Sequence, residues 1–220
     1  MQARCTLQPT RVGEVVIRGA PITSGYWSDP ESTSRAIDSS GWLRTGDLGW
    51  FDSRGYLMLC GRRKDMIKSG GENIHASEVE SSLAAIVEVQ EAAVVGVPHA
   101  RYGETVAALL YVRPHACGTA ASSKWENFIR REVARGWSAC ELVVLEGDML
   151  EWLQGNLKRG GLAGFKVPRA VALSQQPVPR TATGKVDKRA VQSLLNSITA
   201  PMHAPGQSGT AVGTVLRSKL

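Results

Sequence analysis

Lys185 stands near the end of the sequence in a setting that suits phosphate binding. It follows Gly184 within the run PRTATGKVDKR, residues 179–189, and further basic residues come after it. The glycine predicts a turn with the lysine at its tip, because glycine reaches backbone conformations that other residues avoid. On its own this is a weak signal, since a single lysine is usually an ordinary surface residue. Its meaning depends on blocks that lie upstream.

Asp47 and Arg62 are candidates for contacts with a nucleotide. Asp47 follows Thr45-Gly46, where a carboxylate can accept two hydrogen bonds from a ribose diol and the glycine lets the backbone approach closely. Arg62 lies in the run GRRKD, residues 61–65, and its guanidinium can reach a ribose or a phosphate with a geometry that lysine cannot copy. The plainer alternatives are an aspartate in a glycine-flanked turn and a solvated basic patch.

Lys68 and the pair Gly70-Gly71 form a third group. Paired glycines allow a thin strand or loop to line a narrow passage, and the alternative is a plain turn between a strand and a helix. The four histidines, at positions 75, 99, 115 and 203, form no arrangement with serine and aspartate that predicts nucleophilic catalysis.

Three blocks in this order closely resemble the C-terminal third of the adenylate-forming enzymes, the acyl-CoA synthetases: residues 42–49 (WLRTGDLG), 61–74 (GRRKDMIKSGGENI) and 179–189. The resemblance implies an ATP-dependent ligase that joins a small carboxylic acid to CoA in two steps. ATP and the acid first give an acyl adenylate and pyrophosphate, with Mg²⁺. The small domain then swings about a hinge, and the CoA thiol displaces AMP.

The resemblance also implies roles in the first step. The ammonium of Lys185 would bridge the substrate carboxylate and the nucleotide phosphate, where it stabilises the charge that shifts in the transition state. Asp47 and Arg62 would contact the ribose of ATP or AMP.

Other residues would serve the change to the second step. Lys64 matches the hinge position, where a few residues absorb a large backbone rotation. Lys68 matches a lysine that some relatives use in the second conformation, and Gly70-Gly71 would wall the tunnel for the pantetheine arm of CoA.

The sequence departs from the family pattern in two ways. It lacks the Ser/Thr/Gly-rich loop that grips the phosphates of ATP and the Tyr-Gly-x-Thr-Glu segment that supplies a glutamate to Mg²⁺. Both belong to the large domain, so we expect no metal ligands here and little or no activity from this chain alone. An insertion or a mis-spliced stretch would explain residues 118–147. Residues 61–80 look most like ligases for aryl or medium-chain acids, including 2-succinylbenzoate–CoA ligases.

The predicted fold class is α+β, in three parts. Residues 1–63 are expected to be the closing β-rich part of a large AMP-binding domain, with strands at 13–19 and 56–60. Residues 64–198 are expected to form the mobile C-terminal domain, a short antiparallel sheet flanked by helices, with strands near 92–97, 105–112, 140–145 and 170–173. Residues 199–220 predict a flexible tail.

Helix starts are predicted from local signals. A short helix opens at Asp29-Pro30, and a last helix covers residues 188–195. Two helices between them are predicted from the capping signals Ser77-x-x-Glu80 and Ser123-x-x-Glu126, and a third is predicted to open at Asp148-x-x-Glu151.

Composition narrows the classes of partner. The 220 residues are 43% hydrophobic and 21% charged, which is ordinary for a globular protein that buries a core. The net charge of +6 is scattered along the sequence, and a basic surface for ATP and CoA explains it without a nucleic-acid partner. No apolar run reaches membrane-spanning length, and four widely spaced cysteines predict thiols rather than zinc ligands or disulfides.

The sequence ends in Ser218-Lys219-Leu220, a tripeptide that an import receptor reads as a peroxisomal address. A tail rich in small and polar residues would present it freely, and an accidental match is the alternative. A competing function for the whole chain is a non-catalytic module that binds nucleotide or partners with a retained fold.

Overall fold

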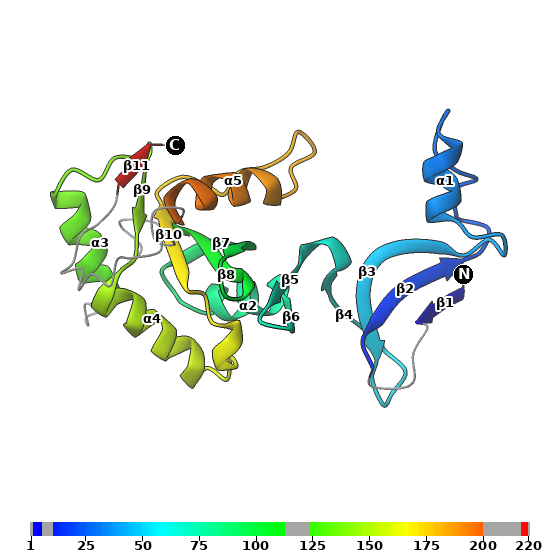
Figure 1. The fold of residues 1–220 in the computed structure, drawn as a ribbon, viewed down its shortest axis with the longest axis horizontal. Coiled ribbons are helices and arrows are strands. Elements are labelled where there is room, and N and C mark those ends of the chain that lie inside the picture. The colour runs from blue at the N-terminus through cyan, green and yellow to red at the C-terminus, as the bar shows by residue number, and fades with distance from the viewer. Residues whose placement is uncertain (1, 6–10, 113–123, 200–216, 220) are drawn as a thin grey trace. The chain divides into compact units, whose positions relative to one another are not determined.

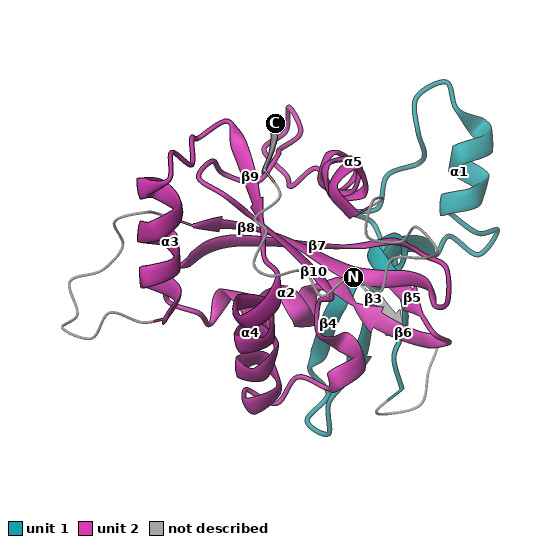
Figure 2. Ribbon diagram, turned by 60° about the vertical axis from the view of Figure 1, so that its left-hand side comes forward, with its two compact units in different colours: residues 1–66 teal, residues 67–220 magenta. Residues whose placement is uncertain are grey.

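The computed structural model describes residues 2–5, 11–112, 124–199 and 217–219, with side chains in 11–112 and 124–199. Figure 1 shows the order of the elements, and Figure 2 shows the two compact units that they form, Met1–Met66 and Ile67–Leu220. The boundary between the two units lies between Met66 and Ile67, and the sequence predicts the change between the two parts at residues 63–64.

The first unit is a four-stranded antiparallel sheet with one helix. The strands run in the order β1 (Gln2–Cys5), β2 (Gly13–Arg18), β3 (Leu43–Phe51) and β4 (Leu57–Arg62). Helix α1 (Pro30–Ala36) begins where it is predicted, because the Asp29 side chain accepts a hydrogen bond of 2.8 Å from the backbone N–H of Ser32.

The second unit is a mixed sheet covered by helices. Its strands are β5 (Met66–Ser69), β6 (Glu72–His75), β7 (Val89–His99), β8 (Gly103–Val112), β9 (Glu141–Val144), β10 (Ala170–Ser174) and β11 (Arg217–Lys219). They follow the order β11-β9-β10-β8-β5-β6, and β7 forms a long antiparallel hairpin with β8. The expectation of a purely antiparallel sheet is wrong for β10, which pairs parallel to β8. A parallel pair needs a crossover, and helices α3 (Lys124–Ala134) and α4 (Gly147–Arg159) lie in the connection.

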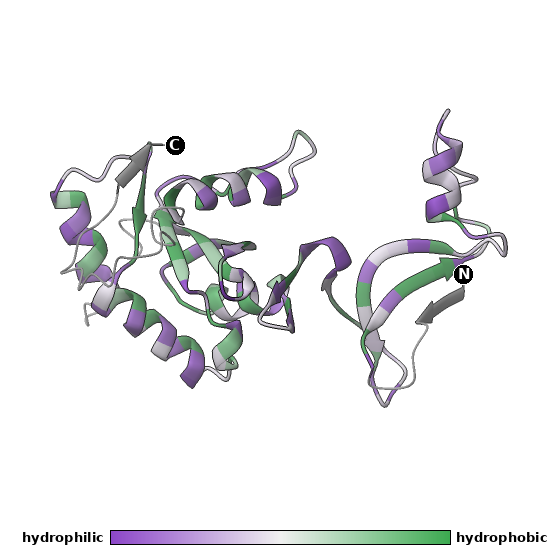
Figure 3. Ribbon diagram, viewed as in Figure 1, coloured by the Kyte–Doolittle hydropathy of each residue, from purple (hydrophilic) through white to green (hydrophobic). Residues whose placement is uncertain are grey.

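Strand β8 is buried on both faces because side chains alternate along it. Val106, Ala108 and Leu110 belong to one core cluster with residues of α2 (Ala76–Ala84), α3 and α4. Ala107 and Leu109 belong to a second cluster with residues of α5 (Lys188–Thr199). Figure 3 shows the result as largely hydrophobic central strands and helices of mixed character.

The capping box predicted at Ser77 is wrong. Strand β6 ends at His75 and α2 begins at the next residue, Ala76, so Ser77 lies inside the helix. The carbonyl of Ser77 accepts a hydrogen bond of 2.8 Å from Ser81 Oγ. The helix that the sequence predicts to open at Asp148 is confirmed: α4 begins at Gly147, directly after Glu146, and Asp148 lies in its first turn. Ser123 lies outside the described residues.

The end of the chain differs from the flexible tail that the sequence predicts. Strand β11 pairs antiparallel with β9, with Ser218 opposite Leu142, and so covers an edge of β9 that would otherwise be unpaired. Residues 200–216 and Leu220 lie outside the described residues. Within segment 118–147, Trp125 and Val143 are fully buried parts of the core.

Candidate active site

Asp47 and Arg62 lie opposite each other on neighbouring strands. They are register partners of β3 and β4, and Arg62 Nε is 3.1 Å from Asp47 Oδ1. Their side chains are 33% and 49% exposed, so the pair is open to a ligand. The structure therefore brings together two residues that are 15 positions apart in the sequence and that both predict contacts with ribose.

Local hydrogen bonds and two glycines fix the backbone of β3 in the segment Thr45-Gly46-Asp47-Leu48-Gly49. Gly46 has a φ of +73°, and Asp47 N–H donates to Thr45 Oγ1 at 3.0 Å, while Thr45 Oγ1 donates to the carbonyl of Val15 at 2.8 Å. A Cβ on Gly49 would stand 2.6 Å from the carbonyl oxygen of Met58, so only glycine lets β4 approach here. The backbone around Asp47 is thus held in place by its own neighbours.

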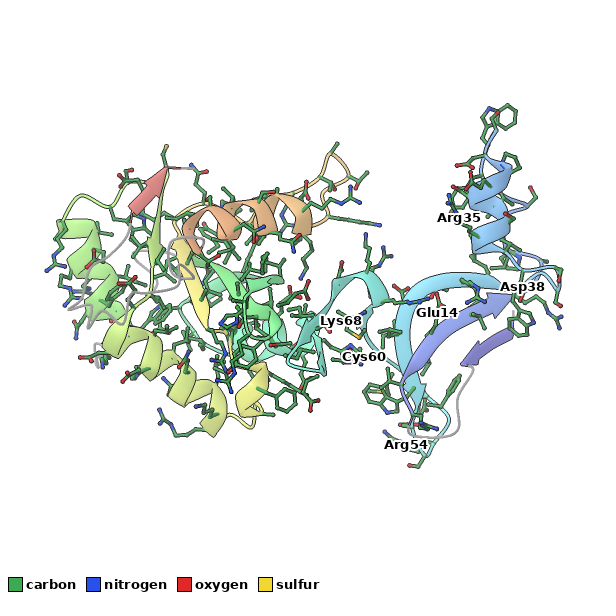
Figure 4. All side chains as sticks on the ribbon, viewed as in Figure 1. Glu14, Arg35, Asp38, Arg54, Cys60 and Lys68 are labelled. Atoms are coloured by element: carbon green, nitrogen blue, oxygen red, sulfur yellow. The ribbon has the colours of Figure 1, made fainter. Side chains whose placement is uncertain are left out.

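Glu14 on β2 supports this corner, and sequence reasoning missed it. Figure 4 labels this side chain, whose Oε2 lies 3.3 Å from Arg44 Nη1 and 3.6 Å from Arg63 Nη1. Arg63 therefore shares the carboxylate of Glu14 with Arg44, whereas Arg62 pairs with Asp47. No motif marks Glu14, because its partners Arg44 and Arg63 are distant from it in the sequence.

Lys64 lies in a single 3-10 turn, Arg63–Asp65, between β4 and β5, and its side chain is exposed. The boundary between the two units falls just beyond it, between Met66 and Ile67. This location is compatible with the hinge that the sequence predicts.

Lys68 and the glycine pair lie in the second unit. Lys68 is exposed on β5 (Figure 4), and its backbone N–H donates to Glu104 Oε2 at 2.9 Å. Gly70 and Gly71 form the turn between β5 and β6 with φ values of +59° and +88°, a region that favours glycine. Gly70 N–H donates to the carbonyl of Tyr102 at 2.9 Å, so the turn is fixed to the β7–β8 hairpin.

Lys185 lies in a hydrogen-bonded turn directly before α5. Gly184 has a φ of +80°, its N–H donates to the carbonyl of Thr181 at 2.9 Å, and Thr181 N–H donates to the carbonyl of Lys185 at 2.8 Å. The side chain of Lys185 is exposed, and within the described ranges its ammonium has no hydrogen-bond or ion-pair partner. Asp187 Oδ1 accepts from Ala190 N–H at 3.1 Å and so caps α5 directly after the turn.

Residues 78–185 match the family of AMP-binding enzyme C-terminal domains. These residues belong to that family. The match ends at Lys185 and covers most of the second unit's core.

The curated relatives of this chain are CoA ligases. A 3-[(3aS,4S,7aS)-7a-methyl-1,5-dioxo-octahydro-1H-inden-4-yl]propanoyl:CoA ligase of Rhodococcus jostii is 36% identical over 82% of this chain and 29% of the relative. An indoleacetate–CoA ligase of Aromatoleum aromaticum is 35% identical over 86% of this chain and 31% of the relative. A butyrate–CoA ligase of Arabidopsis thaliana, named as peroxisomal, is 33% identical over 85% of this chain and 27% of the relative. The chain thus spans less than a third of these relatives.

Solved structures show the same fold. ATP-bound MatB from Rhodopseudomonas palustris matches with a TM-score of 0.67 and 30% identity over 90% of this chain and 34% of its own. The amide bond synthetase McbA from Marinactinospora thermotolerans matches with a TM-score of 0.67 and 34% identity over 88% and 34%. An O-succinylbenzoate coenzyme A synthetase from Bacillus subtilis, in complex with AMP, matches with a TM-score of 0.62 and 27% identity over 84% and 31%.

One histidine close to the turn of Gly70 and Gly71 has a shifted pKa. Burial lowers the pKa of His75, the ammonium of Lys166 lowers it further, and the carboxylate of Glu78 opposes both. The described residues hold no group of three His, Cys, Asp or Glu side chains that could bind a metal ion. No helix among them is long and apolar enough to cross a membrane.

Proposed function

We propose that this chain is the C-terminal part of an ATP-dependent carboxylate–CoA ligase and that Lys185 is its adenylating lysine. The observation that carries the proposal is an exposed ammonium, without an acidic partner in the described residues, at the tip of a hydrogen-bonded turn. A lysine held in this way is available to an anionic reactant, whereas a structural lysine would be engaged by the protein. The large domain that this chain lacks would supply the acid pocket and the grip on the ATP phosphates.

In the first step, the strand pair β3–β4 would hold the nucleotide. Arg62 Nε already binds one oxygen of Asp47, which leaves the second carboxylate oxygen to accept from a ribose diol and the two Nη groups to donate. Lys185 would meet the substrate carboxylate and the α-phosphate together. Its charge then stabilises the transition state more than the separated reactants.

In the second step, rotation at Lys64 would replace Lys185 at the reacting centre by the turn of Gly70 and Gly71. Their positive φ values leave a bare backbone beside which the thin pantetheine arm of CoA could pass. Lys68, exposed on β5 before this turn, would then face the reactants. A hinge at Lys64 is compatible with the short 3-10 turn Arg63–Asp65, which lies just before the boundary between the two units.

A chimaera tests this proposal. The segment of the indoleacetate–CoA ligase that this chain matches is replaced by residues 1–220, and indoleacetyl-CoA is measured with ATP and CoA. We expect product that requires both, and loss of product in Lys185→Ala. A folded chimaera that binds AMP but makes no acyl adenylate would instead support a non-catalytic nucleotide-binding module.

The acid and the location are further proposals. The relatives act, by their names, on different acids, and the likeness to an O-succinylbenzoate synthetase makes 2-succinylbenzoate a first candidate in a substrate screen of the ligase with its large domain.

Peroxisomal import through Ser218-Lys219-Leu220 is supported by the tripeptide and by one relative named as peroxisomal. A fluorescent protein fused before Met1 should enter peroxisomes, and deletion of Leu220 should abolish import.

A further inference from the structure

Arg180 joins the Lys185 turn to the sheet. Its Nη1 donates to the carbonyl of Gly184 at 2.9 Å, and its Nη2 donates to Glu91 Oε1 on β7, also at 2.9 Å. Gly184 is the residue directly before Lys185. One planar guanidinium therefore grips the backbone beside the lysine and a carboxylate of the sheet at the same time, which an ammonium cannot do in two fixed directions.

Glu91 secures the same segment at a second point. Its other oxygen, Oε2, accepts from the backbone N–H of Val178 at 3.3 Å, just before the turn begins. The Glu91 side chain is 28% exposed and that of Arg180 is 45% exposed, so the bridge is partly shielded from water. The carboxylate thus ties the start of the turn directly and its tip through Arg180.

The remaining contacts of the turn are local. The bonds between Thr181, Gly184 and Lys185 run within the turn itself, and the bridge between Arg180 and Val186 closes its base. In the described part of the chain, these local bonds shape the turn but do not attach its tip to the sheet.

We propose that Glu91 and Arg180 are positioning residues that fix the tip of the Lys185 turn for adenylation. The proposal rests on the role proposed for Lys185. It gives a function to an arginine and a glutamate that would otherwise be one more surface ion pair, and it requires their effect to be selective for the first half-reaction.

Hydrogen–deuterium exchange of the 220-residue chain tests the clamp without any activity. In Glu91→Gln and Arg180→Lys, the amides of Thr181 and Gly184 should exchange about fivefold faster or more, because the tip opens more often. The matched control is the exposed pair Glu31–Arg35 on α1, where Glu31→Gln and Arg35→Lys should leave these amides unchanged. Exchange in the clamp variants equal to that in the controls would overturn the proposal.

The chimaera tests the selectivity. In Glu91→Gln, kcat for acyl-adenylate formation should fall about ten- to a hundredfold, with KM for ATP changed less than about twofold, because a displaced lysine affects the transition state. Conversion of preformed indoleacetyl adenylate and CoA to product should not change. An equal fall in both half-reactions would mean general damage and would overturn the positioning role. A parent chimaera without adenylation would overturn the proposed function instead, and the exchange data would still decide whether the clamp orders the turn.

Discussion

Replacing Lys188 by methionine should destabilise the second unit although the neighbouring Lys185→Met should not. Lys188 Nζ donates to the Glu80 carboxylate and, at 2.8 Å, to the carbonyl of Val94. Glu80 Oε1 also accepts from Val94 N–H at 2.9 Å. The ammonium therefore joins the start of α5 to both α2 and β7.

The expected loss of unfolding free energy in Lys188→Met follows from the burial of the Lys188–Glu80 ion pair. The side chains of Lys188 and Glu80 are 24% and 26% exposed. Breaking a fully buried ion pair costs about 3–5 kcal/mol, and an exposed pair contributes about 0–1 kcal/mol. A pair that is three-quarters buried and carries a further hydrogen bond to a charged group should lie between these limits, so we expect about 2–3 kcal/mol. Methionine keeps most of the volume, which limits any cavity term.

The assay is urea unfolding of the 220-residue chain followed by the fluorescence of tryptophan, with Trp125 in the core of the second unit. Lys185→Met is the matched control, because its exposed side chain should change the free energy of unfolding by less than about 0.5 kcal/mol. The reasoning is refuted if Lys188→Met also loses less than about 0.5 kcal/mol, or if both variants lose the same amount.

Three further predictions concern the fold. Gly49→Ala should destabilise the first unit by about 1–3 kcal/mol in thermal unfolding, because its Cβ would stand 2.6 Å from the carbonyl of Met58, whereas Gly55→Ala, with open space at its Cβ, should show only the strain of its positive φ. Leu195→Ala should cost about 2–5 kcal/mol in urea unfolding, since this side chain is fully buried against the sheet, and a loss below about 1 kcal/mol would contradict that packing. The pKa of His75 is lowered in the folded state, so protonation favours the unfolded state, and the free energy of unfolding should fall as the pH drops from about 6.5 through the lowered pKa. In His75→Gln the free energy of unfolding should depend less on pH in this range, and an unchanged slope would exclude the effect.

Local signals in the sequence predict those elements that local contacts determine. The hairpin β7–β8 follows from two apolar runs around a turn, and α1 follows from Asp29 and the proline after it. The C-terminal domain family is likewise predicted by three short blocks, and residues 78–185 confirm it.

The rest depends on partners that are distant in the sequence. The segment around Asp47 suggests a turn, but β2 and β4 pair with it on both sides and make it strand β3. Glu80 suggests a helix cap, but it serves Val94 and Lys188 instead. Lys185 and Lys188 look alike in the sequence, and only the tertiary structure separates an available ammonium from an engaged one.

The most direct test of the central claim is the rate of ATP–pyrophosphate exchange in the chimaera, compared between Lys185→Ala and its parent. We predict a loss of about a hundredfold or more, because a cation that stabilises developing charge is absent. Conversion of preformed acyl adenylate and CoA to product should stay within about threefold of the parent. Unchanged exchange in Lys185→Ala would contradict the account, because the turn before α5 would then present an ordinary surface lysine.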